Sequence, residues 1–273
     1  MMNKHSDITV ILTLYKTPKE KLKNLNHYKK YKIIFFDQES DGSFKNIIKY
    51  FFKSNFEYYS SKKNIGLSKS SNFLLSKVKT KYCLFTQPDI EIFESSILLL
   101  KKAIKFKKDA IFSAPRIVKR IKNSNKNKKL DFKIKNKINA ACMMCDVEKL
   151  KKTGFFDEDF FLYWEDIFLM KKINQTNYKM LAVNNAFASH DSSQSSKNTI
   201  KTDLIRSKNF TYGEFVYDYK LKKFRKLKII RKLVQNIMFF FFNFVLFKLK
   251  QSLINLANIM GIFKFLNFYI KSK

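Results

Sequence analysis

The feature that most constrains the fold is an alternation of short apolar runs with helix-like segments in the first half of the chain. Four runs are rich in β-branched and aromatic residues: 8–15, 31–37, 81–87 and 110–115. Helix-like segments lie between them, around 18–28, 43–53, 67–78 and 95–107. This alternation is typical of βα units, so the sequence predicts an α/β fold built on a parallel sheet.

Polar residues stand at the ends of three of these predicted strands. Thr13 and Tyr15 end the first strand, Asp37 ends the second, and Asp89 follows the third. In open α/β sheets, ligands bind beyond the carboxyl ends of the strands. These four residues are therefore the first candidates for a binding site.

The acidic residues are few and clustered. The chain has 22 Asp and Glu against 55 Lys and Arg, a formal charge of +33. Eleven of the 22 acids lie in three short segments, Asp37–Asp41, Asp89–Glu94 and Asp157–Asp166. Acids that only served surface ion pairs would be scattered among the lysines. Their concentration near strand ends predicts a site that handles a cation or a proton.

One cluster has the spacing of a metal site. Asp89 and Glu91 are two residues apart, and in an extended segment this spacing points both side chains the same way. Paired carboxylates suit Mg²⁺ or Mn²⁺ shared with substrate phosphates. His190 follows a strand-like run at 179–188. It is either a third metal ligand or a structural or exposed histidine.

The cysteines point away from disulfides and zinc. Cys83, Cys142 and Cys145 fit no disulfide framework, and the one C-x-x-C pair lies inside the apolar stretch AACMMC. We therefore expect a buried strand there and a reducing compartment. The polar start MMNKHSD precedes a short apolar run without a small-residue cleavage site, so we expect no signal peptide.

The positive charge implies an anionic partner, such as a membrane surface, nucleic acid or phosphorylated substrate. Abundant Lys, Asn, Ile and Phe together also indicate a general compositional bias, which would make much of the lysine solvated surface. The basic segment 119–137 holds nine cations and one acid. It is either a flap over the site or a solvated insertion.

The last part of the chain is basic and strongly apolar. After Asp218 there are thirteen Lys and Arg and no acid, and two apolar stretches occupy 237–247 and 252–270. The first is shorter than the roughly 20 residues of a membrane span, and the second carries three Asn and Lys264. We predict two helices in a membrane interface with cations on anionic headgroups. The alternative is a helical hairpin packed on the catalytic domain or a second subunit.

Six motifs in order resemble those of the family 2 glycosyltransferases, which have a GT-A fold. They are ITVILTLYKTP, FFDQESDGS, NIGLSKSSN, FTQPDIEIF, INAACMMCDVEKLKKTGFFDEDFFLYWEDIFL, and the position of His190. Within that family the chain is most similar to the rhamnosyltransferase-type branch that builds bacterial surface polysaccharides. The resemblance runs from about Ile8 to about Tyr219, which implies a GT-A domain at 1–219. It leaves 220–273 uncovered, and for these residues the composition predicts a helical, membrane-associating tail.

The resemblance implies roles for the strand-end residues. Asp37 would read the nucleotide base, and Asp89 and His190 would hold Mg²⁺ or Mn²⁺, with Glu91 as a less certain helper. The remaining nucleotide- or donor-contacting residues would be Thr13, Tyr15, Asn64, Gly66 and Asn72.

The acceptor-side motif implies the chemistry. In FFLYWEDIFL, Asp166 would be the general base that activates an acceptor hydroxyl, and Glu165 would bind the acceptor or support the base. The rival assignment makes Glu165 the base, and a third reading has both acids capping a helix. Trp164 and Tyr163 would stack on an acceptor sugar.

Three positions depart from the family pattern. Gln87 replaces the first acid of a D-x-D motif, Asn139 replaces a glycine before the acceptor-side strand, and Phe168 replaces an acid after the Glu-Asp pair. These departures concern the metal site and the acceptor.

The implied function is inverting transfer of a sugar, such as rhamnose, from a nucleotide-diphosphate donor to a lipid-linked or growing glycan. The enzyme would be cytoplasmic and peripheral on the inner face of the cell membrane, and we expect no nucleic acid partner. Two alternatives remain: a basic nucleic-acid- or membrane-binding protein without catalysis, and a degenerate glycosyltransferase that serves as a scaffold. The first has only charge in its favour, because no nucleic-acid-binding motif is present.

Overall fold

The chain forms two compact units. The computed structural model describes residues 6–121, 129–190, 196 and 198–272. Unit 1 consists of Met1–Ile65, Lys69–Phe156 and Leu169–Lys197, and unit 2 of Gly66–Ser68, Asp157–Phe168 and Asn198–Lys273. The predicted division into a domain at 1–219 and a tail at 220–273 stays a prediction.

Unit 1 contains a mixed sheet. Its described strands are β1 (Ile8–Tyr15), β2 (Lys32–Gln38), β3 (Phe56–Ser61), β4 (Tyr82–Thr86), β5 (Ile90–Ile92), β6 (Ala110–Val118), β7 (Phe132–Lys135), β8 (Met143–Asp146) and β9 (Lys179–His190). They are ordered β3-β2-β1-β4-β8-β6-β9-β5, and β7 also pairs with β9.

The parallel sheet predicted from the sequence is confirmed for β1, β2 and β4, and β3, which was not predicted, extends it. β1 pairs in parallel with β2 and β4, and β2 with β3. Beyond β4 the sheet is mixed. β6 pairs in parallel with β9, but β8 runs antiparallel to β4 and β6, and β5 and β7 run antiparallel to β9, so the expectation of a purely parallel sheet is wrong there. The strand expected within AACMMC is confirmed as β8. β5 and β7 are too short for a periodic pattern to reveal them.

Helices cover both faces of this sheet. They are the 3-10 helix η1 (Lys19–Tyr28) and the α-helices α1 (Phe44–Phe52), α2 (Leu67–Lys77), α3 (Glu94–Phe106), α4 (Val147–Thr153) and α5 (Glu165–Ile173). One face packs β1 residues against η1, α1 and α3, through Val10, Leu12, Leu22, Ile48 and Leu100. The other packs β1 and β6 against α2, α4 and the end of α5, through Ile11, Phe112, Leu74, Leu150 and Met170.

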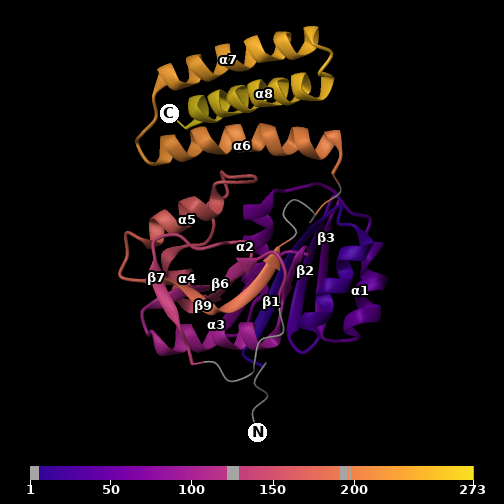
Figure 1. Ribbon diagram of the computed structural model, residues 1–273, viewed down its shortest axis with the longest axis vertical. Helices are drawn as coiled ribbons and strands as arrows, with labels where there is room; N and C mark the ends of the chain where they lie inside the picture. The colour runs from indigo at the N-terminus through magenta and orange to yellow at the C-terminus, as the bar shows by residue number, and fades with distance from the viewer. Residues whose placement is uncertain (1–5, 122–128, 191–195, 197, 273) are drawn as a thin grey trace. The chain divides into compact units, whose positions relative to one another are not determined.

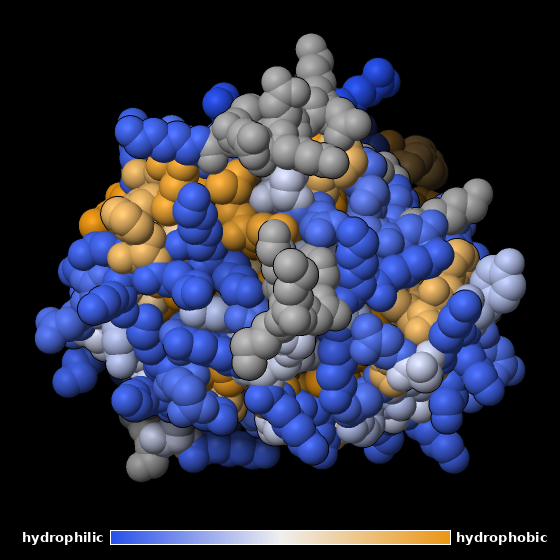
Figure 2. Space-filling model, turned by 90° about the horizontal axis from the view of Figure 1, so that it is seen from below, coloured by the Kyte–Doolittle hydropathy of each residue, from blue (hydrophilic) through white to orange (hydrophobic). Residues whose placement is uncertain are grey.

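The face drawn in Figure 2 is predominantly hydrophilic, with smaller apolar patches between the polar residues. Cys83, Cys142 and Cys145 are free and buried, as expected for an apolar strand region.

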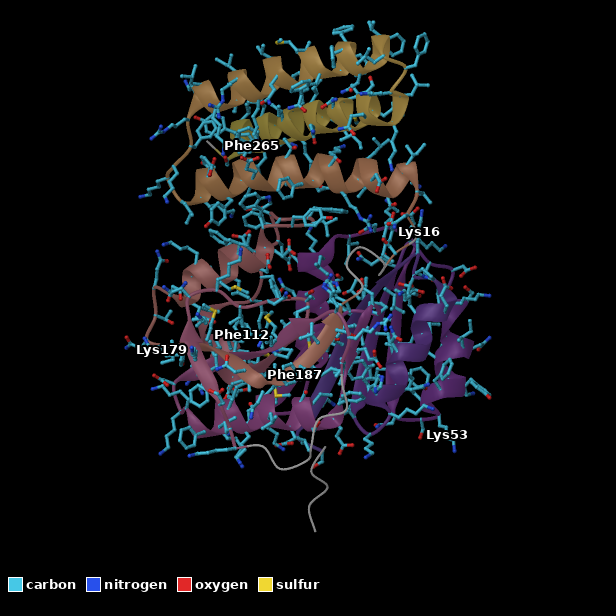
Figure 3. All side chains as sticks on the ribbon, in the orientation of Figure 1. Lys16, Lys53, Phe112, Lys179, Phe187 and Phe265 are labelled. Carbon is cyan, nitrogen blue, oxygen red and sulfur yellow. The ribbon has the colours of Figure 1, made fainter. Side chains whose placement is uncertain are left out.

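Unit 2 is built on three helices that lie side by side, α6 (Ile200–Lys220), α7 (Lys226–Val245) and α8 (Leu249–Lys271) (Figure 1). The two helices predicted in the tail are confirmed, and α7 begins well before the apolar stretch that predicted it. Their shared core includes Phe215 of α6, Ile229 of α7 and Phe265 of α8, which is labelled in Figure 3.

The polar residues of α8 make contacts between helices. Asn258 Oδ1 accepts a hydrogen bond from Thr211 of α6 at 3.0 Å, and Asn258 Nδ2 donates to Asn236 Oδ1 of α7 at 3.0 Å. Lys264 Nζ donates to Asn209 Oδ1 of α6 at 3.0 Å. The polar residues of α8 are not confined to one side of the helix, because α8 contacts two neighbouring helices on different sides.

Among the described helices, α8 alone is long and apolar enough to cross a membrane, and it is partly buried. Core helices of soluble proteins can have the same length and composition, so these properties alone do not show a span.

Gly261 allows the closest approach between α8 and α6. A Cβ added at Gly261 would lie 2.4 Å from the backbone oxygen of Lys208. In an isolated helix, Gly→Ala stabilises by about 1 kcal/mol. Here we expect Gly261→Ala to destabilise the protein by about 1–3 kcal/mol, because the added methyl group overpacks the contact. Thermal or urea unfolding would measure this.

The matched control is Asn267→Ala, an exposed position on the same helix. We expect it to be neutral or slightly stabilising. If Gly261→Ala also stabilised the protein, the close packing of α8 on α6 would be refuted.

Candidate functional site

The predicted donor-side residues of β1 and β2 lie at one edge of the sheet. Parallel pairing places Leu14 opposite Asp37 and Tyr15 opposite Gln38, so the strands end together. Thr13 Oγ1 lies 3.2 Å from Ser70 Oγ of α2, and Tyr15 OH donates to Glu39 Oε2 at 3.1 Å. Lys16, labelled in Figure 3, follows Tyr15 at this edge. The edge is therefore lined with hydroxyl groups and charged side chains.

Asp37 is buried and held by a neighbouring strand. Its residue is 1% exposed, and Tyr58 OH of β3 donates to Asp37 Oδ2 at 2.6 Å. Burial raises the pKa of Asp37, and hydrogen bonds from Ser40 and Tyr58 partly oppose this rise. The bond from Tyr58 orients the carboxylate at the end of the sheet.

Asp89 and His190 are brought together by the pairing of β5 with β9. The antiparallel register puts Ile90 opposite His190. Asp89 precedes β5 in a turn in which Ile90 N donates to Gln87 O at 3.1 Å. As a result, His190 Nε2 lies 3.5 Å from Asp89 Oδ2, and the Asp89 side chain is fully buried. Two residues far apart in sequence thus form one pair in unit 1.

Glu91 has other partners. It accepts a hydrogen bond from Ser189 Oγ at 3.4 Å, and its Oε1 lies 3.4 Å from His27 Nε2. The expectation that Asp89 and Glu91 point the same way assumed an extended segment. Asp89 instead lies in a turn, so the alternation of a strand does not apply to it. A metal role for Glu91 stays a prediction.

Asn72 ties two parts of unit 1 together. Its Nδ2 donates to Phe156 O at 2.8 Å, and its Oδ1 accepts from Phe156 N at 3.0 Å. This reciprocal pair fixes α2 to the backbone that leads toward the acceptor-side motif. Asn64, at the other end of the same motif, lies in the loop before α2.

Gly66 belongs to unit 2 and its backbone requires glycine. Its φ is +91°, and a Cβ there would lie 2.6 Å from Phe161 O. Beside it, Leu67 N donates to Phe161 O at 2.7 Å. This contact seats the loop before α2 on the backbone of the acceptor-side motif.

Tyr163 and Trp164 pack on α6. Trp164 Nε1 donates to Phe210 O at 3.0 Å, and the indole lies 5.4 Å from the Phe210 ring and 5.3 Å from the Tyr217 ring. A Cβ at Gly213 would lie 2.8 Å from Trp164 Cδ1, so this glycine makes room for the indole. Their predicted contact with an acceptor sugar stays a prediction.

The backbone just before the two acids is unusual. Tyr163 has φ +68° and Trp164 has φ +72°, a region that costs about 1–2 kcal/mol per non-glycine residue. The contacts of both rings with α6 compensate this strain. The strain is located where the chain turns into α5 and sets the direction of its first residues, Glu165 and Asp166.

Those two acids have different environments. Glu165 is 6% exposed, and its Oε2 has no hydrogen-bond partner among the described residues. Burial, with the neighbouring Asp166 carboxylate, raises the pKa of Glu165 to about 8. Asp166 is half-buried and accepts a hydrogen bond from Ile167 N at 2.8 Å. Glu165 is therefore mostly protonated at neutral pH. The environment of Glu165 thus suits it to a different chemical role from that of Asp166.

The residues of unit 1 fit a divalent metal ion. A buried carboxylate and an imidazole nitrogen 3.5 Å apart can ligate one ion, whose remaining positions suit diphosphate oxygens and water. Within the described part of the chain, no group of three or more His, Cys, Asp or Glu forms a complete metal site. The arrangement suits an ion shared with a phosphorylated ligand.

Two predicted features are only partly described. Within the basic segment 119–137, Phe132–Lys135 form β7, whereas 122–128 lie outside the described residues. Residues 191–195 of the Ser-rich segment after His190 also lie outside them.

Several site-forming residues were missed from the sequence. Tyr58, which holds Asp37, lies on β3, a strand not predicted. The aromatic, β-rich run FEYYS was a signal for it. Gly213 and Phe210, which contact Trp164, lie on α6. No pattern in the local sequence indicates that this helix packs against Trp164.

Comparison with known proteins identifies the family. The model for glycosyl transferase family 2 matches residues 13–170, more than half of the 273-residue chain. Among curated proteins no match was found.

Similar solved structures share the fold. They include GalNAc-T7 with UDP, GalNAc and Mn²⁺, at 15% identity and TM-score 0.60, covering 81% of this chain and 54% of that one. The mannosyltransferase PcManGT from Pyrobaculum calidifontis, with GDP-Man and Mn²⁺, has 12% identity and TM-score 0.56, covering 96% and 87%. S. aureus TarS 1-349 with UDP-GlcNAc has 15% identity and TM-score 0.51, covering 76% and 66%.

The chain thus spans about half of the GalNAc-T7 structure and just under two thirds of the TarS fragment. The shared fold is the mixed α/β arrangement of GT-A glycosyltransferases. With the match over 13–170, the chain belongs to glycosyl transferase family 2.

Proposed function

We propose that this protein is an inverting, metal-dependent glycosyltransferase that moves a sugar from a nucleotide-diphosphate donor to an acceptor hydroxyl. The observation that carries the proposal is the Asp89–His190 pair, 3.5 Å apart, in a chain of glycosyl transferase family 2. The similar structures hold UDP, UDP-GlcNAc or GDP-Man, which supports a nucleotide-sugar donor.

On the donor side, Asp37 contacts the nucleobase. Its carboxylate, held by Tyr58, can accept a hydrogen bond from a ring N–H of uracil, thymine or guanine. Thr13 and Tyr15 flank it on β1. Asn64, Gly66 and Asn72 shape the loop and helix start near the donor.

Asp89 and His190 would hold Mg²⁺ or Mn²⁺, and Glu91 would assist them. When bound, the ion neutralises the charge that grows on the leaving diphosphate. The protein residues supply a buried carboxylate and an oriented imidazole that need little rearrangement.

On the acceptor side, Asp166 removes the proton from the attacking hydroxyl. A base must be ionised to accept a proton, and Glu165, with its pKa raised to about 8, is mostly neutral at pH 7. This favours Asp166 over Glu165 as the base. Neutral Glu165 can instead donate a hydrogen bond to the acceptor. Direct displacement by the hydroxyl inverts the anomeric carbon.

The finer assignments follow the sequence resemblance. The donor sugar is rhamnose or a related sugar, the acceptor is a lipid-linked or growing glycan of a surface polysaccharide, and Tyr163 and Trp164 line the acceptor site. The enzyme is cytoplasmic and peripheral on the inner membrane face, held by the basic tail 220–273.

Asp166→Asn removes the proposed base while keeping the size of the side chain. We expect sugar transfer to fall about 10²- to 10⁴-fold with donor binding retained. Transfer rate and donor affinity would be measured on folded protein. Glu158→Gln, an exposed acid of the same cluster, serves as the control. Near-normal transfer by Asp166→Asn would exclude this residue as the base.

Asp89→Asn and His190→Gln test the metal pair. We expect each to weaken Mn²⁺-dependent binding of UDP or GDP by at least about tenfold in a thermal-shift titration. Glu91→Gln is the matched comparison, and it should retain most of the effect because Glu91 has partners in Ser189 and His27. Equal loss in all three variants would make Glu91 a direct ligand, and no loss in any would refute the metal site.

The raised pKa of Glu165 makes stability depend on pH. Between about pH 5 and pH 8 the folded protein keeps a proton that the unfolded chain releases, so stability falls as pH rises. The fall approaches about 1.4 kcal/mol per pH unit for one group. Glu165→Gln should remove it, as measured by urea unfolding at several pH values.

Glu148→Gln, whose side chain is 69% exposed, is the control and should keep the wild-type slope. A Glu165→Gln variant with an unchanged slope would show that Glu165 ionises normally in the folded protein.

A further inference from the structure

α7 has two sides of opposite character. On one side, Lys228 and Lys232 pair with Glu214 of α6, and Asn236 bonds to Asn258 of α8. On the opposite side, apolar residues recur at spacings of three and four. This outer face of α7 consists of Leu227, Ile230, Val234, Met238, Phe241 and Val245, which are 50–75% exposed.

The outer face continues at the turn between α7 and α8. Phe247 in this turn is 88% exposed, and Leu249 at the start of α8 is 56% exposed. A 20-residue helix is about 30 Å long, so this is a long apolar strip. Isolated exposed apolar residues are ordinary, but a continuous strip of this length marks an interaction surface.

Cations stand at both ends of the strip. Lys226 and Arg231 are exposed in its first part, and Lys248 and Lys250 are exposed beyond its end. Between Leu233 and Phe247 the sequence has no charged residue, and no acid follows Asp218. An apolar helix face flanked by cations matches a bilayer with anionic headgroups.

We propose that the outer face of α7 binds the surface of an anionic lipid bilayer, with α7 lying in the plane of the interface and α8 remaining packed in unit 2. The inference deepens the membrane location proposed above by naming the surface and the role of each helix.

The contacts of α8 argue against a span by that helix. Gly261 packs on the backbone of Lys208, and Asn258 and Lys264 bond to residues of α6. Insertion across a bilayer would break these contacts and place Lys264 in hydrocarbon.

Charge argues against a second copy of the chain as the occupant. Each chain carries +33, and the cations around the strip on two copies would repel one another. An anionic bilayer instead satisfies both the apolar strip and its flanking cations.

The test replaces three outer-face residues, Ile230→Gln, Val234→Gln and Phe241→Gln, in one full-length variant. Binding would be measured by co-sedimentation with vesicles of equimolar phosphatidylglycerol and phosphatidylcholine. We expect binding at least about tenfold weaker than wild type, equivalent to about 1.4 kcal/mol. Gln is a good helix former, so the helix should persist.

The matched control is Tyr50→Gln with Phe106→Gln, two exposed aromatic residues of unit 1, which should bind vesicles like wild type. A second variant, Lys226→Glu with Arg231→Glu, tests the cations on the same surface and remains informative if the triple variant does not fold. It should weaken binding to the anionic vesicles. Donor hydrolysis should be the same in every variant as in the wild type. If the wild-type enzyme shows no donor hydrolysis at all, that result counts against the transferase activity and not against the membrane-binding surface.

Three results would overturn the proposal. The first is vesicle binding that is unchanged in the folded triple variant and in the charge-reversal variant. The second is wild-type protein that stays in vesicles after extraction with alkaline carbonate, as a spanning α8 would require. The third is a wild-type dimer that the triple variant converts to monomer without loss of vesicle binding.

Discussion

The pairing of β1 between β2 and β4 is the interaction on which the rest of the structure depends. β1 contributes Val10 and Leu12 to one core and Ile11 to the other, so both faces of the strand are buried. A strand buried on both sides must satisfy its backbone groups through neighbouring strands. Its parallel register with β2 then makes Tyr15 and Asp37 end at the same edge. The predicted donor-side residues thus lie at the end of a strand that is buried on both faces.

Burial gives the few acids of this chain distinct properties. Asp37 is held by Tyr58, Asp89 lies beside His190, and Glu165 is enclosed with one oxygen lacking a hydrogen-bond partner among the described residues. Burial desolvates the carboxyl groups of Asp37 and Glu165, and desolvation favours their neutral forms. The partners differ, so the outcomes differ: a hydrogen-bonded carboxylate, a pair suited to a cation, and a carboxyl group that is neutral at pH 7. The chain has 55 Lys and Arg, so an acid on the surface would simply be ionised and surrounded by cations. It would have none of these three properties.

Unit 2 contains close contacts at glycine residues, where there is no side chain to separate the packed segments. Gly66 seats the loop before α2 on Phe161, Gly213 makes room for Trp164, and Gly261 brings α8 onto α6. The chain has only five glycines, and these three lie at contacts that a methyl group would obstruct. The strained backbone of Tyr163 and Trp164 is retained because their rings pack on α6. α6 thus helps to orient the turn that leads into the two acids at the start of α5.

The sequence alone predicts β1, β2, β4 and β6, the acids near their ends, the family and the two tail helices, because these depend on local periodicity and short motifs. It did not reveal β5, whose three residues are too few for a pattern, nor the antiparallel pairing that carries His190 to Asp89. The tertiary structure also decided that Asn258 and Lys264 face α6, since a helix with two neighbours buries polar residues on more than one side. These contacts depend on the pairing and packing of segments that are far apart in the sequence. No single segment contains the information that specifies them.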